Sequence, residues 1–528
     1  MKTILGATLA VLAASFLVVG TASAAKELQP IPELSKEQTD KAVDIYFDRC
    51  SGCHGALRKG ATGPNITPAK TRKKTLAKLE KILYEGTDGG MPAWGTDGFI
   101  TRDDAKLLAK FVQIEAPQPP PWDMKKMKDS WKVHVPVADR PTSPPATNWQ
   151  NYFGVVLRDV GKVVIIDGDT KKTLSTIDSG FATHILRTSA SGRYMYAIGR
   201  DGKATIMDMW ATPPNLVAEV KTGVDARSID TSKYKGYEDK YAVVGDYWPS
   251  HYVILRGDTL EPMKIVGTAG YTHDTNEYRE ESRVASIVAS HHAPEWILNL
   301  KEMGVVLLVD YSQVEDGTIT ETMIDAERAL HDGGWDSTKR YFLVAANMRD
   351  TISVIDTVDR KLVKNIKVGT KPHPGRGANW VDPEFGPVWA TVHLGEGLVS
   401  IISTDPKSPK AWTVVREWEL DGNSLFIKTH DNSKYVYCDN TINPTKSNVL
   451  TVFDKTKPTA KPKEIVFEKK VVHIEFNKAG DEAWISLWDP EGEVVVIDDK
   501  TLTVKKRIKG LHTPTGKFNV YNTMKDIY

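Results

Sequence analysis

Cysteine is scarce in this chain: the 528 residues include only Cys50, Cys53 and Cys438. A disulfide framework is therefore excluded as the main source of stability, because small secreted domains that rely on disulfides carry many more cysteines. Cys438 lies in the strand-like run Tyr435-Val436-Tyr437-Cys438, where a cysteine typically acts as a small buried apolar residue. The chain must be stabilised by a large core or by bound cofactors.

The sequence also lacks an excess of either charge, with 69 Lys and Arg against 68 Asp and Glu. This balance argues against nucleic acid or an anionic membrane as the main partner. Long hydrophobic runs are scarce too, since the one such run covers residues 4–19, after Lys2 and before the small residues Ala22-Ser23-Ala24. Residues 1–24 are predicted to be a cleaved signal peptide. An uncleaved anchor helix is the alternative, but the run is short for a bilayer, and we expect no integral membrane protein.

The two remaining cysteines belong to Cys50-Ser51-Gly52-Cys53-His54, the attachment motif for a c-type haem. Two thiols at this spacing can bond both vinyl groups of one porphyrin, and His54 can ligate the iron. Met91, in a Gly/Pro-rich loop downstream, is the best candidate for the other axial ligand. A zinc site is the alternative, but it would need two more Cys or His residues nearby, and none follow in this segment. We therefore expect one covalent haem c.

Helical periodicity over residues 36–57, 76–84 and 102–114 surrounds this motif. The pattern predicts a small all-α class I cytochrome c domain at residues 25–116. Two proline-rich patches, Pro117-Gln118-Pro119-Pro120-Pro121 and Arg140-Pro141-Thr142-Ser143-Pro144-Pro145, bound a predicted linker at residues 117–149. Export and covalent haem together indicate a bacterial periplasm or an equivalent compartment.

An internal repeat begins near residue 150, where helical periodicity disappears. Each unit pairs an aromatic strand with a Val/Ile-rich strand, at a period of about 47 residues that is typical of β-propeller blades. The sequence therefore predicts an all-β eight-bladed β-propeller at residues 150–528; an array of β-sandwiches is the alternative, although sandwich modules repeat at longer intervals. The predicted strand pairs are 152–157 with 163–167, 194–198 with 204–208, 241–244 with 252–255, 296–300 with 305–310, 341–345 with 352–356, 388–392 with 398–402, 435–438 with 449–454, and 484–487 with 494–498.

Several long stretches resemble one family closely, and the similarity covers nearly the whole mature chain. The family is cytochrome cd1 nitrite reductase, which joins a cytochrome c domain to an eight-bladed propeller that holds haem d1. The stretches are Leu57-Arg58-Lys59-Gly60-Ala61-Thr62-Gly63, Leu157-Arg158-Asp159, Ser189-Ala190-Ser191-Gly192-Arg193-Tyr194, Tyr234-Lys235-Gly236-Tyr237-Glu238-Asp239, His331-Asp332-Gly333-Gly334-Trp335-Asp336, His373-Pro374-Gly375-Arg376-Gly377-Ala378-Asn379, and residues 513–523.

The resemblance implies a role for specific residues. His184 would ligate the haem d1 iron, and His331 and His373 would be the catalytic pair over the open iron face. Histidine suits this role because its unperturbed pKa near 6.5 lets it donate protons at neutral pH. The residues implied to form the haem d1 pocket are Arg158, Arg187, Arg200, Arg227, Tyr247, Arg376, Thr515 and Gly516.

The family's activity is the one-electron reduction of nitrite to nitric oxide and water, with electrons passed through haem c, and oxygen reduction to water is an expected side activity. The resemblance also implies a homodimer and a periplasmic electron donor, either a small cytochrome c or a cupredoxin. Two alternatives stay open: a haem d1 biosynthesis protein of the dihydro-haem d1 dehydrogenase type, and an electron carrier fused to an inert propeller. The segment before the first helix has no Tyr or His, which leaves the sixth ligand of oxidised haem d1 open among His331, His373, water and hydroxide.

Overall fold

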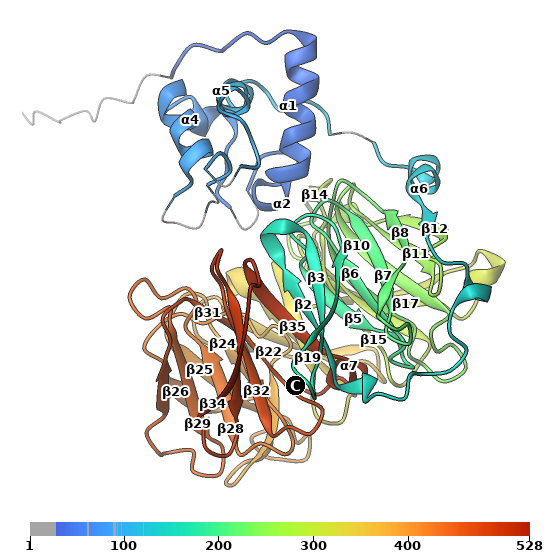
Figure 1. The fold of residues 1–528 in the computed structure, drawn as a ribbon, viewed down its shortest axis with the longest axis vertical. Coiled ribbons are helices and arrows are strands. Elements are labelled where there is room, and N and C mark those ends of the chain that lie inside the picture. Colours follow the sequence, from blue (N-terminus) through green and yellow to red (C-terminus); the bar gives the residue numbers. More distant parts are fainter. Residues whose placement is uncertain (1–27, 61–62, 88–90, 92, 97, 120) are drawn as a thin grey trace, which may run out of the picture. The chain divides into compact units, whose positions relative to one another are not determined.

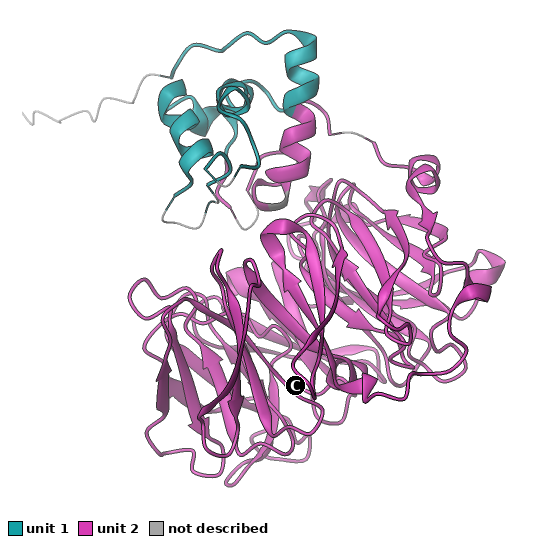
Figure 2. Ribbon diagram, in the orientation of Figure 1, with its two compact units in different colours: residues 1–42, 66–116 teal, residues 43–65, 117–528 magenta. Residues whose placement is uncertain are grey.

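The computed structural model describes residues 28–60, 63–87, 91, 93–96, 98–119 and 121–528. The predicted signal peptide, residues 1–24, lies outside the described residues, as do Gly89, Gly90 and Pro92 beside Met91. The chain divides into two compact units, residues 1–42 with 66–116 and residues 43–65 with 117–528 (Figure 2). Among the described helices, none combines the length and the apolar character needed to cross a membrane.

Five helices follow one another in the first part of the chain: α1 (Lys36–Arg49), α2 (Ser51–His54), α3 (Pro68–Thr71), α4 (Leu76–Glu85) and α5 (Arg102–Phe111) (Figure 1). α1 begins at a capping box, in which the Gln38 backbone N–H donates to Ser35 Oγ and the Ser35 N–H donates to Gln38 Oε1. The predicted helix over residues 36–57 is instead two helices that end at Gly55. Gly55 has φ +79°, a left-handed conformation that stops a helix and favours glycine.

Eight antiparallel sheets, each with four blade strands, form the described propeller, one for each predicted blade. The sheets are β35 (Pro514–Asn519), β2 (Tyr152–Leu157), β3 (Lys162–Asp167) and β4 (Thr173–Asp178); β5 (Ile185–Thr188), β6 (Tyr194–Ile198), β7 (Lys203–Asp208) and β8 (Asn215–Lys221); β9 (Asp225–Thr231), β10 (Tyr241–Trp248), β11 (His251–Arg256) and β12 (Pro262–Gly267); β15 (Val284–Ala289), β16 (Glu295–Leu300), β17 (Val305–Asp310) and β18 (Thr320–Asp325); β19 (Leu330–Trp335), β20 (Tyr341–Ala346), β21 (Thr351–Asp356) and β22 (Lys361–Lys367); β23 (Ala378–Asp382), β24 (Gly386–Val392), β25 (Leu398–Ser403) and β26 (Val414–Glu419); β27 (Ile427–Thr429), β28 (Tyr435–Asp439), β29 (Val449–Asp454) and β30 (Lys463–Val466); and β31 (Val471–Phe476), β32 (Glu482–Leu487), β33 (Glu493–Asp498) and β34 (Val504–Lys509).

The eight-bladed propeller predicted from the sequence is thus confirmed, and all eight predicted strand pairs are the two middle strands of a blade. The middle strands are buried along almost their whole length, which explains their uninterrupted aromatic and branched residues. The outermost strands face solvent; β34, for example, is exposed at four of its six residues. Cys438 is fully buried in β28, as its sequence context predicted.

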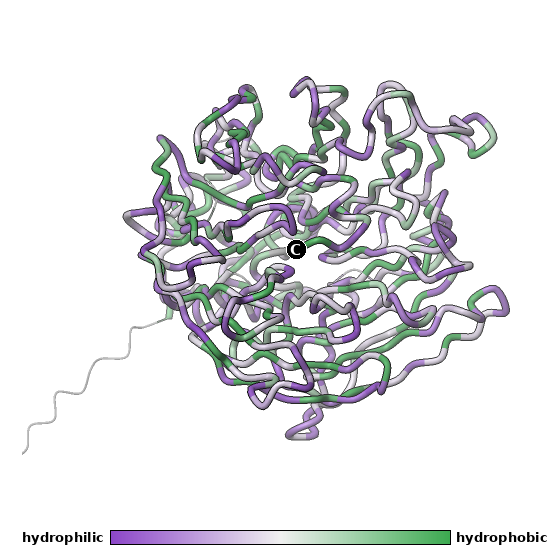
Figure 3. Tube along the Cα trace, turned by 90° about the horizontal axis from the view of Figure 1, so that it is seen from below, coloured by the Kyte–Doolittle hydropathy of each residue, from purple (hydrophilic) through white to green (hydrophobic). Residues whose placement is uncertain are grey.

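The first and last strands of the propeller close the ring together, because β35 pairs with β2 in one blade. Phe153 lies opposite Asn519 in this ladder, and the Phe153 ring stacks on Trp484 of the preceding blade at 3.8 Å between centroids. Figure 3 looks along the propeller and places the chain's end near the middle of the ring. There α7 (Val520–Met524) leads to Tyr528, whose carbonyl accepts a hydrogen bond from the Asn379 N–H at 3.2 Å.

The predicted linker contains structure of its own: α6 (Met124–Ser130) and β1 (Lys132–Val133). β1 pairs with β8 and adds a fifth strand to that blade. The Trp122 and Trp131 indole N–H groups donate to the Lys221 and Thr259 carbonyls at 2.9 and 2.7 Å. This segment therefore lies along the outer edge of the propeller. A further short hairpin joins β13 (Gly270–Tyr271) to β14 (Tyr278–Arg279).

Candidate active site

The first candidate centre is the Cys50–His54 segment, where α1 ends and α2 begins. The His54 ring is buried, and its Nδ1 donates to the Pro64 carbonyl at 2.8 Å, since a carbonyl can only accept. That bond fixes the tautomer and leaves Nε2 with a lone pair for a metal. Gly63 lets the chain approach the ring closely, because a Cβ there would lie 3.0 Å from His54 Cε1. The segment therefore presents an imidazole ready to ligate iron beside two free cysteines.

The described residues offer the zinc alternative too few ligands, since a structural zinc is held by four Cys or His side chains. Within the described ranges, no cluster of potential metal ligands includes Cys50, Cys53 or His54. A covalent porphyrin fits this donor set. Met91 is half-buried, and its carbonyl accepts a hydrogen bond from the Thr87 N–H at 3.0 Å; it belongs to the other compact unit, so its ligation of iron stays a prediction.

The second candidate centre is built on the innermost strands of the propeller. His184, just before β5, is an exposed residue, and no described residue hydrogen-bonds its ring. Burial by surrounding protein, followed by the positive charges of Arg227 and Arg200, lowers the His184 pKa well below its usual value. We infer that a ring exposed to solvent yet surrounded by protein lines an opening in the propeller, called the hollow below. The neutral, unpartnered imidazole is the form that ligates iron.

His331 and His373 lie beside each other, with ring centroids 5.2 Å apart. Both are buried, His331 in β19 and His373 in the loop before β23. His373 Nδ1 donates to the Leu425 carbonyl at 2.8 Å. Burial, and then the charge of Arg227, lowers the His331 pKa well below its usual value, although the Asp332 carboxylate opposes the effect. The structure thus brings together the pair that the sequence implied, with no direct ring-to-ring hydrogen bond.

Asp332 occupies the space between these histidines, and the sequence reasoning assigned it no role. Its Oδ1 lies 3.0 Å from Arg227 Nη1 and 3.3 Å from His331 Nδ1, and its Oδ2 lies 3.3 Å from His373 Nε2. Burial alone would raise the Asp332 pKa, but Arg227 and His331 outweigh it and hold the pKa well below its usual value. In the sequence, the motif His331-Asp332-Gly333-Gly334 points to its histidine. Adjacency to His331 is the one sequence feature that could have indicated a role for Asp332.

Two of the implied pocket arginines, Arg200 and Arg227, join Tyr247 around His184. The Arg200 guanidinium lies over the Tyr247 ring at 4.5 Å and pairs with Asp225 at 2.8 Å. Arg227 donates to the Ala285 carbonyl at 2.7 Å as well as to Asp332. Arg158 also lowers the His184 pKa, so it lies near the same centre. The hollow is therefore rimmed by guanidinium groups.

The other implied pocket residues are engaged elsewhere in the propeller. Arg376 donates to the Gly333 and Ile287 carbonyls at 3.0 and 3.1 Å. Arg187 is buried, with its Nη1 donating to the Leu186 carbonyl at 2.9 Å and its Nε 4.0 Å from Asp230. Thr515 and Gly516 are half-buried in β35, and the Thr515 carbonyl accepts from Ser486 Oγ at 2.8 Å. None of these contacts involves His184, and the assignment of these residues to the haem d1 pocket stays a prediction.

Lys301 and Arg283 are further cations near this centre that the sequence reasoning missed. Burial lowers the Lys301 pKa to about 7, with Arg283 next in effect, and Lys301 in turn lowers the His331 pKa. Arg283 lies over the face of Tyr247 at 5.4 Å and pairs with Glu302. A neutral histidine with several arginine side chains around it fits a planar iron macrocycle that carries carboxylates, as haem d1 does.

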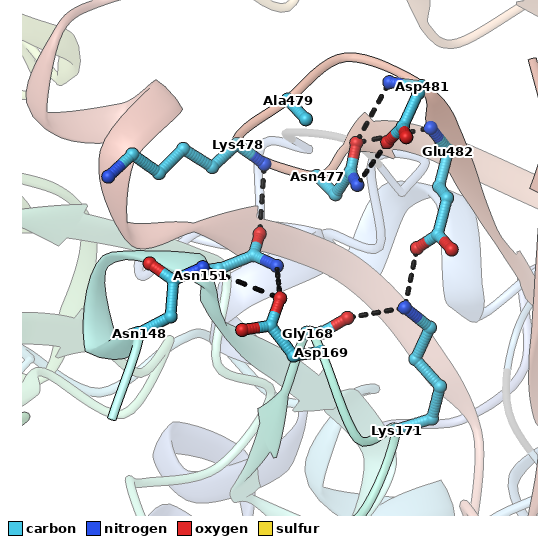
Figure 4. A pocket seen from close by; sticks show the side chains of 10 residues that line it. All are labelled: Asn148, Asn151, Gly168, Asp169, Lys171, Asn477, Lys478, Ala479, Asp481 and Glu482. Carbon is cyan, nitrogen blue, oxygen red and sulfur yellow. Dashed lines mark hydrogen bonds and ion pairs between the residues drawn. The ribbon is translucent and has the colours of Figure 1, made fainter. Parts of the chain in front are cut away.

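A separate surface pocket of about 520 Å³ lies beside the ring closure and is lined by neither histidine centre (Figure 4). Its polar groups already satisfy one another. Lys171 Nζ contacts Glu482 at 2.6 Å, and Asn151 Nδ2 donates to Asp169 at 2.7 Å while its Oδ1 accepts from the Lys478 backbone N–H at 2.9 Å. The pocket is a polar brace between the first and last blades, and it offers a ligand little that is unpaired.

Comparisons with known proteins match both the helical part and the propeller of the chain. A family model for the cytochrome D1 heme domain matches residues 147–523, and one for cytochrome C oxidase, cbb3-type, subunit III matches residues 37–112. A nitrite reductase of Stutzerimonas stutzeri is 45% identical over 94% of this chain and 95% of its own length. A dihydro-heme d1 dehydrogenase of Pseudomonas aeruginosa is 26% identical over 90% of this chain and 93% of its own. The solved structure of dihydro-heme d1 dehydrogenase NirN in complex with DHE superposes with a TM-score of 0.72 at 25% identity, covering 91% of this chain and 99% of its own.

Proposed function

Since the chain belongs to the cytochrome cd1 nitrite reductases and carries haem c and haem d1, we propose that it reduces nitrite to nitric oxide and water in denitrification. The reaction consumes one electron and two protons for each nitrite. One observation carries the proposal at the level of chemistry: two buried histidines lie side by side beside a cation-rimmed hollow that a third, unpartnered histidine lines. Haem d1, when bound, supplies the iron that nitrite binds and that delivers the electron.

The protein's own residues supply charge, protons and a dry site. Arg227, Arg200 and Lys301 make the hollow attractive to an anion. His331 and His373 lie where they can give protons to the oxygen that leaves as water. His331 Nδ1 is buried and faces Asp332 Oδ1 at 3.3 Å, so we assign proton donation to the other ring nitrogen, Nε2. The low His331 pKa makes its imidazolium a strong acid.

His184 would ligate the haem d1 iron. The proposed pocket residues are Arg158, Arg187, Arg200, Arg227, Tyr247, Arg376, Thr515 and Gly516. The haem c ligands are His54 and Met91, with Cys50 and Cys53 as the covalent anchors. The proposed boundaries are a signal peptide at residues 1–24, a cytochrome c domain at 25–116, a connecting segment at 117–149 and the propeller at 150–528. We further propose export to the periplasm, a homodimer, a small cytochrome c or cupredoxin as donor, and oxygen reduction as a side activity.

A haem d1 biosynthesis protein is the second candidate, because a dihydro-heme d1 dehydrogenase shares this two-part plan. Its identity to this chain is 26%, against 45% for the nitrite reductase, which favours the reductase. An inert propeller fused to an electron carrier is disfavoured by the match of residues 147–523 to a haem-binding domain.

The deciding experiment is steady-state nitric oxide release from nitrite by the purified two-haem protein with a reduced donor. We expect turnover in the wild type, and a loss of roughly a hundredfold or more in His331→Ala and His373→Ala with haem d1 retained. The control is His273→Ala, since His273 is an exposed histidine outside both centres. Dihydro-haem d1 oxidation without nitric oxide release would overturn the assignment in favour of the biosynthetic enzyme.

A further inference from the structure

Asp332 is the one described carboxylate that contacts both distal histidines. It lies in β19, and its ligand atoms and those of His331 and His373 all lie within 4.8 Å of one another. Each carboxylate oxygen faces one histidine: Oδ1 is 3.3 Å from His331 Nδ1, and Oδ2 is 3.3 Å from His373 Nε2. One side chain thus spans the two rings.

The contacts of His373 determine where its protons are. Its Nδ1 must carry a proton, because it faces the Leu425 carbonyl at 2.8 Å. Its Nε2 lies 3.3 Å from Asp332 Oδ2. The ring is thus held between a backbone carbonyl and a carboxylate, which together fix its orientation.

His331 depends on Asp332 in another way. His331 Nδ1 is buried without a hydrogen-bond partner among the described residues, so the ion-pair contact with Asp332 Oδ1 at 3.3 Å is what orients the ring. With the Nδ1 proton directed at Asp332, His331 Nε2 is left facing away from the carboxylate. The two histidines thus present different nitrogens to the same carboxylate.

Arg227 keeps this carboxylate ionised and in place. Its Nη1 donates to Asp332 Oδ1 at 3.0 Å and to the Ala285 carbonyl of β15 at 2.7 Å. Because Arg227 is buried and Asp332 half-buried, loss of Arg227 would remove the charge that most favours the ionised carboxylate. The Ala285 carbonyl therefore holds Arg227, Arg227 holds Asp332, and Asp332 contacts both histidines.

We propose that Asp332 is a positioning residue of the nitrite site: it bridges His331 and His373, fixes their ring orientation and keeps their protons directed for delivery. This inference rests on the proposed function. Simple charge effects predict the opposite outcome on removal of the carboxylate, because loss of a negative charge beside the iron should strengthen the binding of an anion. Weaker nitrite binding after removal of the carboxylate therefore indicates that Asp332 positions the histidines, whereas tighter binding indicates that it acts only through its charge.

The test uses the loaded enzyme with Asp332→Asn, Asp332→Glu and a matched control, Asp356→Asn. Asp356 also pairs with an arginine, Arg340, at 2.7 Å, but it is buried at the end of β21, outside both centres. Two quantities are measured from pH 6 to 8: the nitrite dissociation constant of the oxidised enzyme, by optical titration without turnover, and the pH profile of nitric oxide release.

For D332N we expect nitrite binding weaker by about tenfold, and an activity profile whose fall with rising pH begins at lower pH than in the wild type. D332E should lie between wild type and D332N, because it keeps the charge and moves it by one methylene; D356N should match the wild type in both measurements. If D332N fails to retain haem d1, D332E alone decides, with a loss of about threefold expected.

Wild-type binding and pH profile in D332N, or in D332E where D332N does not load, would overturn the bridge. Tighter nitrite binding in D332N would also overturn it, since Asp332 would then act as a bystander charge. Failure of the proposed function has a different signature: the wild-type enzyme itself would release no nitric oxide.

Discussion

At the scale of single residues, environment decides which histidine does what. His184, His331 and His373 were all visible in the sequence, as histidines in stretches that resemble the family. Asp332 was not, because an aspartate's role here depends on a contact with His373, 41 positions away, which no local pattern encodes. The charged residues near His184 come from separate blades, so no local sequence pattern could show that they lie together.

Replacing His184 with alanine should abolish or misligate haem d1 while the c-type spectrum persists. The physical reason is that His184 lines the hollow with a neutral ring and no described hydrogen-bond partner. Its loss should therefore affect the stability of the fold little. Absorption spectra of the purified variant, before and after extraction of pigment, provide the measurement. Full haem d1 content with an unchanged spectrum would show that another residue ligates the iron.

Nitrite turnover should increase as pH falls through the range from 8 to 6. Burial and Arg227 lower the His331 pKa, so only an acidic medium, or the arrival of an anion, fills the proton-donating form. Asp332 favours that form, whereas Arg227 and Lys301 oppose it. In His331→Ala the residual activity should depend less steeply on pH, and a slope equal to that of the wild type would count against His331 as donor.

Lys517 should make the protein more stable as pH rises from 7 to 10. Burial lowers its pKa from 10.5 to about 7, against the opposing charges of Glu475 and Asp439, so the folded chain binds fewer protons than the unfolded chain in this window. The contribution is present above pH 10.5 and is lost as pH falls toward 7, up to roughly 4 kcal/mol. Lys517→Met should flatten this rise in chemical denaturation, unlike Lys506→Met on the exposed face of β34. An unchanged slope in Lys517→Met would contradict the argument.

At the scale of elements, the sequence predicted the middle strands of every blade and few of the others. Middle strands are buried on both faces, so they show as runs such as Val163-Val164-Ile165-Ile166. Inner strands are short or carry charge and glycine, as β27 and β19 do, because they face the hollow. β1 was missed because a two-residue strand between proline-rich patches has no periodicity to detect.

Loss of β35 should open the ring. A chain ended after Leu511 would leave β2 with an unpaired edge, and Phe153 and Val155 would lose the neighbours they have in β35. We expect a melting temperature lower by roughly 10 °C, with aggregation that depends on concentration. Val466→Lys, on the exposed outer strand β30, is the control and should change stability little. A truncated chain that stays monomeric and equally stable would show that closure adds nothing.

At the scale of the whole molecule, two cofactor centres imply two kinds of attachment. Cys50 and Cys53 offer covalent bonds, whereas the described residues around His184 offer only ligation, charge and shape. Extraction with acidified acetone should therefore remove one haem d1 for each chain and leave one haem c bound. Iron and pigment assays on both fractions measure this, and a single haem for each chain would leave only an electron carrier.

The pairing of β35 with β2 also bears on how the protein is made. Asn519 and Asn151, which hydrogen-bond at the closure, are 368 positions apart, so the clasp can form only after almost the entire propeller has left the ribosome. Until β35 is synthesised, one edge of β2 is unpaired and could pair with a neighbouring nascent chain. Only a chain that includes β35 can close the ring. Chains that stop earlier would keep the β2 edge unpaired and would remain open to proteases.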